Sequence, residues 1–282
     1  MTDEKEEAPV EEKNEVVLET EITVEDNVAV VETPSEEALE EILGDKTEAD
    51  VIVIDVTKEA KDATVVELPV DLIEAIAEAA ADEDNTVDSL AIKLPVGTVT
   101  IDAKTLSALV EQAEGDSIRL VLEKDTEHRL NEKQTKAVAD YEVHEFIEAY
   151  FICTKTEKRI SDFKGGVAIL SIPFEIPAGK VAKGFKVWYV DDEGGMEELV
   201  TWHEDGHLFW EVGHFSDFVI IYDETAEAVE DSVVVDTESA DGATIEEPAE
   251  SAGFPWWIIA GVVVVVVVVF VLKRKKDEDI ED

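Results

Sequence analysis

Apolar and polar residues alternate over much of the chain between residues 51 and 222, interrupted by two stretches with helical periodicity. The order strand, helix, strand occurs in residues 64–94 and again in residues 98–122. Period-two alternation indicates strands, and apolar residues on one side of a stretch indicate a helix. Neither copy can bury its apolar faces alone. We therefore predict one duplicated domain over residues 49–125, which also takes in a strand at residues 51–56.

A second region of short strands begins near Tyr141, after a polar and helical connector at residues 130–138. Turn residues at 191–195 and 204–206 separate the strands. Several short strands at even spacing are typical of an antiparallel β-sandwich, which we predict, with an Ig-like arrangement, for residues 126–222. The expected strands are residues 141–153, 166–172, 185–190, 197–202, 208–212 and 218–222.

Both flanks of these regions are acidic and poor in aromatic residues, a composition that buries too little apolar surface to fold. We expect residues 1–48 to be a flexible arm and residues 223–254 a linker. Within the arm, residues 35–44 could form a short helix with a serine cap and a glycine stop.

An uninterrupted apolar run reaches from Trp256 to Leu272 and includes valine at every position from 262 to 269. At about 1.5 Å per residue a helix of this length spans roughly 25 Å, close to the hydrocarbon thickness of a bilayer. Backbone groups in lipid must be satisfied internally, so a helix is required despite the valines. We predict a transmembrane helix at residues 255–272 and a short cytoplasmic tail at residues 273–282. The fold class is thus expected to be α+β: a duplicated strand–helix–strand domain, an antiparallel β-sandwich and one C-terminal transmembrane helix.

Residues at both ends of this run suit a membrane interface. Trp256 and Trp257 lie where an aromatic belt is expected, and a basic cluster marks the cytoplasmic side. The cluster is Lys273, Arg274, Lys275 and Lys276. The lipid bilayer is therefore the expected partner of residues 256–272.

Topology follows less directly, because residues 1–30 lack the basic and apolar regions of a signal peptide. Either a leader was removed, or the chain is tail-anchored with its bulk in the cytosol. Tail anchoring would oppose the positive-inside bias. We favour a single-pass protein of the cell membrane with extracellular N-terminal domains and a cytoplasmic C-terminus.

The charge balance excludes some partners. The chain has 23 basic and 70 acidic residues, a net charge of -47. Nucleic-acid binding needs a basic footprint, and an anionic membrane surface would repel this chain. Cys153 is the only cysteine, so no internal disulfide can form, and it is expected to be a core thiol. A cysteine-poor surface protein suggests a prokaryotic source.

Three short motifs in residues 187–218 resemble a C-terminal module of cell-surface proteins from clostridia and related Gram-positive bacteria. That module has a Val-Tyr-Tyr-Val-Asp-Asp hairpin and a His-Phe-Ser final strand, and archaeal surface proteins fit the chain equally well. The matching segments are Val187-Trp188-Tyr189-Val190-Asp191-Asp192-Glu193-Gly194, Asp205-Gly206-His207-Leu208-Phe209-Trp210 and His214-Phe215-Ser216-Asp217-Phe218. The similarity covers roughly residues 60–222 and implies a cell-surface location. No Leu-Pro-x-Thr-Gly sortase motif precedes Trp256, which leaves the helix as the anchor.

Candidate chemistry is sparse. His203 and His207 match the His-Glu-x-x-His spacing of zinc proteases, but that site needs a helix, and Asp205-Gly206 predicts a hairpin turn instead. The two histidines could still face each other across the hairpin and form a weak metal site. The acidic turn Asp191-Asp192-Glu193 could contribute calcium ligands, although a solvated turn is the simpler interpretation.

His214-Phe215-Ser216 resembles the cleavage sequence of β-sandwich domains that cut themselves between Phe and Ser. The serine hydroxyl would attack the preceding carbonyl with the histidine as base. The alternative is that Phe215 fills the core while Ser216 opens the last strand.

The sequence therefore predicts a membrane-anchored structural or adhesive surface protein that is not an enzyme and uses no cofactor. The expected partners are the bilayer and a cell-wall polymer or another surface protein, with no nucleic acid. The alternatives are a self-cleaving surface domain and a tail-anchored cytosolic adaptor.

Overall fold

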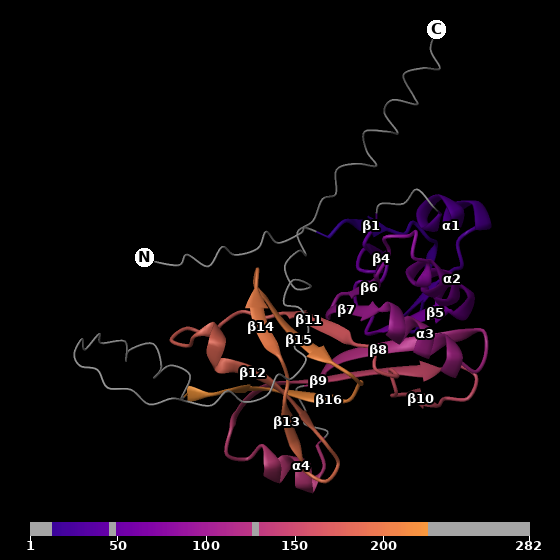
Figure 1. Ribbon diagram of the computed structural model, residues 1–282. Coiled ribbons are helices and arrows are strands. Elements are labelled where there is room, and N and C mark those ends of the chain that lie inside the picture. Colours follow the sequence, from indigo (N-terminus) through magenta and orange to yellow (C-terminus); the bar gives the residue numbers. More distant parts are fainter. Residues whose placement is uncertain (1–12, 45–48, 126–129, 225–282) are drawn as a thin grey trace, which may run out of the picture. The chain divides into compact units, whose positions relative to one another are not determined.

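The computed structural model describes residues 13–44, 49–125 and 130–224 (Figure 1). The described residues from Val16 onward belong to one compact unit built mainly from two mixed β-sheets and a few helices. This confirms the expectation of a β-rich α+β fold. The predicted transmembrane helix, its interface residues Trp256, Trp257 and Lys273–Lys276, and the predicted linker beyond residue 224 lie outside the described residues. Within the described ranges, no helix is long and apolar enough to cross a membrane.

Seven strands form the first sheet, in which β4 and β6 are parallel and the pairs from β6 to β14 are antiparallel. In spatial order the strands are β1 (Glu15–Val17), β4 (Val51–Asp55), β6 (Ser89–Leu94), β7 (Gly97–Asp102), β11 (Ala168–Pro173), β15 (His207–Val212) and β14 (Thr201–Glu204).

The second sheet is nine-stranded and mixed, with β3 and β5 parallel. Its order is β13 (Met196–Glu198), β12 (Phe185–Val190), β16 (Asp217–Tyr222), β9 (Glu142–Cys153), β8 (Ser117–Asp125), β5 (Val65–Pro69), β3 (Val28–Val31) and β2 (Ile22–Glu25), and β10 (Arg159–Ile160) pairs with β9.

The expected duplication is present as β5–α2–β6 and β7–α3–β8, where α2 is Val70–Ala81 and α3 is Ala103–Gln112. In both copies one strand joins the seven-stranded sheet and the other joins the nine-stranded sheet. Each helix therefore connects the two layers. Leu72, Ile73 and Ile76 of α2 and Leu106 and Leu109 of α3 enter the same main core as the strands of both sheets.

A third strand–helix–strand unit precedes these two, which corrects the expectation of a flexible arm for residues 13–44, the described part of residues 1–48. It consists of β3, α1 (Glu36–Leu43) and β4, and its two strands pair in parallel with β5 and β6. Ala29 and Val31 of β3 are buried in the main core, so the acidic composition of this region reflects its exposed positions. The predicted short helix is confirmed: the Ser35 hydroxyl accepts from the amide of Ala38, and the helix ends at Gly44.

The expected boundary between residues 125 and 126 does not separate two folded bodies. β7 pairs with β11 from Thr98 to Ile101, and β8 pairs with β9 from Ile118 to Asp125. Both sheets therefore run from the duplicated region into residues 126–222. Those later residues do not form a separate antiparallel Ig-like domain. The physical reason is that each strand–helix–strand unit leaves open strand edges, which the later strands pair with.

The connector forms α4 (Glu132–Ala137), as predicted, and covers the outer side of the nine-stranded sheet. Val219 and Ile221 of β16, Phe146 of β9 and Val190 of β12 form a second, smaller core with Val138. Figure 1 shows α4 beside β13 at one end of the fold. The predicted strand at 197–202 is two strands, β13 and β14, which belong to different sheets and flank Leu199 and Val200.

Candidate functional site

The His-Glu-x-x-His segment forms the hairpin of β14 and β15, as the turn residues predicted. Asp205 and Gly206 have φ of 45° and 76°, the left-handed conformations of a two-residue hairpin turn. His203 pairs with Leu208, and His207 pairs with Glu204. Residues opposite one another share a face of the sheet, so the two imidazoles lie on opposite faces. This corrects the expectation that they face each other.

His203 lies on the inner side, where its ring packs edge-on against Phe174 at 5.8 Å between ring centres. Its Nε2 is buried without a hydrogen-bond partner. Burial, and then the charge of His207, lower the pKa of His203. Among the described residues, no group of three or more His, Cys, Asp or Glu side chains could hold a metal ion.

The His214-Phe215-Ser216 segment is organised around the aromatic core. Phe215 is buried, stacks on Phe151 at 5.1 Å and meets Phe163 edge-on at 5.0 Å. The His214 ring packs against Tyr189 at 4.8 Å. Among the described contacts, no hydrogen bond joins His214 to Ser216, and the Ser216 carbonyl accepts from the amide of Ala149. The packing favours the core role of Phe215, and a single intact mass for the purified, denatured chain would rule out cleavage at Phe215-Ser216.

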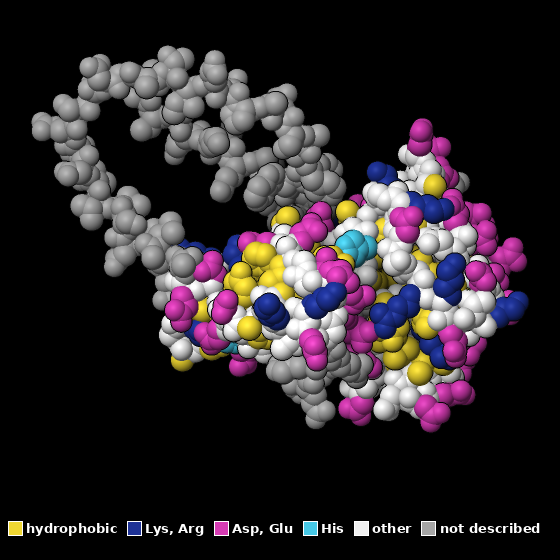
Figure 2. All heavy atoms as spheres, turned by 90° about the horizontal axis from the view of Figure 1, so that it is seen from below, with side chains coloured by type: hydrophobic (Ala, Val, Ile, Leu, Met, Phe, Trp, Pro, Cys, Tyr) yellow, Lys and Arg dark blue, Asp and Glu magenta, His cyan; other side chains and the backbone are white. Residues whose placement is uncertain are grey.

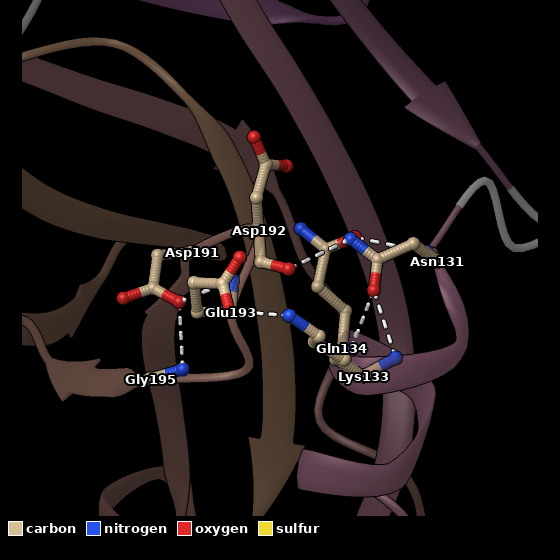
Figure 3. Close-up of polar contacts among 7 residues, drawn as sticks. All are labelled: Asn131, Lys133, Gln134, Asp191, Asp192, Glu193 and Gly195. Atoms are coloured by element: carbon tan, nitrogen blue, oxygen red, sulfur yellow. Dashed lines mark hydrogen bonds and ion pairs between the residues drawn. The ribbon is translucent and has the colours of Figure 1, made fainter.

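The acidic turn between β12 and β13 binds its own backbone (Figure 3). The Asp191 carboxylate accepts from the amides of Glu193 and Gly195 at 2.8 and 2.7 Å. Those bonds close the turn and occupy one carboxylate oxygen that a calcium ion would need. The structure therefore supports the simple interpretation of this segment as a turn.

Three side chains at the start of α4 bond to this turn and to the strand before it, and all three are labelled in Figure 3. Asn131 forms a capping box with Gln134 and donates to the Asp192 carbonyl at 3.1 Å. Gln134, which is buried, donates to the Val190 carbonyl at 3.1 Å, and Lys133 forms an exposed ion pair with Glu193. These contacts fix the connector to the sheet.

A group of titratable side chains that the sequence did not indicate lies where β9 is bulged. The register of β9 and β16 shifts between Ile220 and Ile221, which leaves His144 as an extra residue. His144 Nε2 lies 3.2 Å from Glu142 Oε1, too poorly aligned for a hydrogen bond. The other Glu142 oxygen pairs with Lys180, whose ammonium also lies 3.6 Å from the centre of the Tyr222 ring.

Lys180 is the main reason that the pKa of Glu142 is lowered: its hydrogen bond and charge favour the carboxylate, the charge of His144 adds to them, and burial opposes them. The Tyr222 hydroxyl accepts from the amide of Val181 at 3.3 Å, and the His144 ring packs edge-on against Phe185. The arrangement is a structural ion-pair network against core aromatic residues. A surface hollow of about 450 Å³ lies elsewhere, between the β1–β2 connection and the start of α1.

Cys153 is a core thiol, as predicted. It is fully buried, and its Sγ donates weakly to the Gln112 carbonyl at 3.5 Å. Its surroundings offer no neighbouring base in the described contacts.

No family model, curated protein or solved structure matches this chain. The resemblance to clostridial and related surface modules therefore stays a prediction that rests on its motifs.

Proposed function

We propose that this chain is a single-pass, membrane-anchored surface protein whose β-rich unit is a structural or adhesive platform. The observation that carries the proposal is the apolar run from Trp256 to Leu272 with Lys273, Arg274, Lys275 and Lys276 directly after it. Such a run is the length of a membrane span, and its basic flank supports an outer location for the large N-terminal part.

The architecture supports a platform. The described strands at the sheet edges are short: β1 and β13 have three residues, β2 and β14 have four, and β10, which pairs only with β9, has two. Short edges limit strand addition between copies. The unit would accordingly present its faces, and not its edges, to partners. Figure 2 shows acidic side chains spread over the face that it presents, with lysine and arginine side chains between them.

Protease shaving of intact cells tests the topology, with one epitope tag at Met1 and another at Asp282. We expect the N-terminal tag to be lost and the C-terminal tag to be protected. Lysed cells, in which both tags are cleaved, are the control. The opposite protection pattern would mean a tail-anchored cytosolic protein, and the surface proposal would be wrong.

A further inference from the structure

The outer face of the seven-stranded sheet carries an ordered row of aromatic and hydroxyl side chains. Leu208, Trp210 and Val212 of β15 point into the main core, so Phe209 and its alternate neighbours lie on the opposite face. The register then places Trp202, Phe209, Ser171 and Thr98 side by side across four strands, β14, β15, β11 and β7.

The aromatic end of this row is a stacked pair. The rings of Trp202 and Phe209 are 5.2 Å apart at 9° between their planes. Trp202 lies on the edge strand β14, beside Val200, which is 63% exposed. Because β14 is an edge strand, Trp202 has a neighbouring strand on one side only. The face of the indole turned away from Phe209 therefore lies at the edge of the sheet.

Polar groups without partners lie next to this pair. Ser171 is 8% exposed, yet its hydroxyl makes no hydrogen bond within the described structure. The indole N–H of Trp202 is likewise without a hydrogen-bond partner in the described residues. The Trp202 N–H is sealed from solvent, so of these two groups only the Ser171 hydroxyl is open to a ligand with hydrogen-bonding groups.

A second row runs parallel to the first. Glu211, Ile169 and Thr100 are opposite one another on β15, β11 and β7. Burial and the nearby Asp102 raise the pKa of Glu211, which gives a carboxyl group of reduced acidity beside the aromatic pair. On the other side of Phe209 lies the His207 ring, 6.2 Å from it.

We propose that this face, made by Trp202, Phe209, Ser171, Thr98 and Glu211, binds a neutral polysaccharide. A sugar ring has an apolar C–H face that packs on an aromatic ring and a rim of hydroxyls that both donate and accept. The rows supply both kinds of contact within one side of one sheet.

The charge of the molecule decides which polysaccharide fits. At a net charge of -47, with Glu204 and Glu211 beside the aromatic pair, an anionic polymer would be repelled. The same repulsion disfavours a second copy of this chain. A neutral glycan avoids this repulsion and can still form hydrogen bonds with the Ser171 hydroxyl. The inference rests on the adhesive role proposed above, because it names the partner class of that platform.

The test measures binding of the full chain, kept in micelles of a zwitterionic detergent without sugar groups. The probes are cellohexaose and chitohexaose, with oligogalacturonate as the anionic comparison, each titrated calorimetrically and by tryptophan fluorescence. We expect saturable binding of at least one neutral hexasaccharide and none of oligogalacturonate. Trp202→Ala should weaken that binding about tenfold or more, the loss usual for a central aromatic contact.

Two further variants separate binding from folding. Ser171→Ala keeps the volume of a small side chain and should still weaken binding severalfold. Tyr141→Ala, which removes an aromatic residue that is 42% exposed and directly precedes β9 of the other sheet, should leave binding unchanged. Thermal melts of all variants report whether the fold is retained.

The proposal is overturned if neither neutral hexasaccharide binds, if oligogalacturonate binds equally well, or if Ser171→Ala and Trp202→Ala bind like the parent chain. These results do not depend on topology. If the shaving experiment shows the opposite protection pattern, the surface location is wrong but the binding data still stand. If the titrations show no binding, the glycan proposal is wrong but the proposed anchor is unaffected.

Discussion

At the scale of single residues, the structure separates side chains that hold the core from those that the sequence suggested for chemistry. Phe215 shows this most clearly, because its ring contacts both Phe151 and Phe163. The residues flanking it, His214 and Ser216, have separate partners on Tyr189 and on the Ala149 amide. The His-Phe-Ser motif is therefore accounted for by packing.

Phe215→Ala should lower the free energy of unfolding by about 3–5 kcal/mol, because it removes a large buried side chain and leaves a cavity. Urea titration followed by fluorescence measures the change. Ile176→Ala, at a position 39% exposed, is the control and should change it by less than about 0.5 kcal/mol. Equal effects of the two substitutions would contradict the core role of Phe215.

His203 should make stability depend on pH. Burial lowers its pKa below 6.5, so the unfolded chain binds the proton more tightly than the folded chain. Stability contributed by neutral His203 is therefore present above pH 6.5 and is lost as the pH falls below it. We expect unfolding free energies measured at pH 5.5 and 8 to differ less in His203→Gln than in the parent chain. His214→Gln is the matched control, since the His214 ring packs against Tyr189 and not against His203; an identical pH profile for the parent and His203→Gln would refute this assignment.

At the scale of elements, most of the strands and helices could be predicted, while their pairing could not. Period-two alternation located β12, β15 and β16 within a residue or two, and the serine and glycine at its ends located α1. Alternation reports that a strand has a buried face but not which strand lies beside it. For this reason the shared sheets and the parallel pairing of β3 with β5 were missed.

The candidate sites were missed for a related reason. The bulge that sets His144 beside Glu142 is a property of the pairing between β9 and β16, and no residue in β9 marks it. The stacking of Trp202 on Phe209 likewise follows from hairpin register. The hairpin turn itself was predictable, because Asp205-Gly206 favours positive φ. The acidic composition of residues 13–44 concealed β1, β2 and β3, which are only three or four residues long and too short to show a clear alternation.

Helix α4 depends on one buried hydrogen-bond pair more than on its surface ion pair. Gln134 donates to the Val190 carbonyl and accepts from the Asn131 amide. Gln134→Ala should lower the opening free energy of α4 by about 1–3 kcal/mol, because a buried acceptor loses its donor. Hydrogen exchange of the α4 amides measures this.

The control for that experiment is Lys133→Ala, which breaks the exposed ion pair with Glu193 and should cost about 1 kcal/mol or less. If Lys133→Ala opened the helix as much as Gln134→Ala, the surface contact would be the main attachment and the argument from burial would fail.

At the scale of the whole molecule, both sheets contain strands from the duplicated region and from the later residues, so the described unit has one shared core. Each of the three strand–helix–strand units places one strand in each sheet, and β11 and β9 add later strands to the same sheets. The main core accordingly mixes residues from both predicted domains, such as Leu72 of α2 and Trp210 of β15. Neither half has a complete core of its own.

This continuity predicts a single cooperative unfolding transition for residues 16–224. Leu170→Ala in β11, which is fully buried, should destabilise the unit by about 2–5 kcal/mol. Because β11 pairs with β7, exchange of the β6 and β7 amides should accelerate to the same extent as exchange in β15. Calorimetry should give equal calorimetric and van't Hoff enthalpies. Two separate transitions, with β6 and β7 still protected in Leu170→Ala, would instead mean that residues 49–125 fold independently, and the shared core would not be what stabilises them.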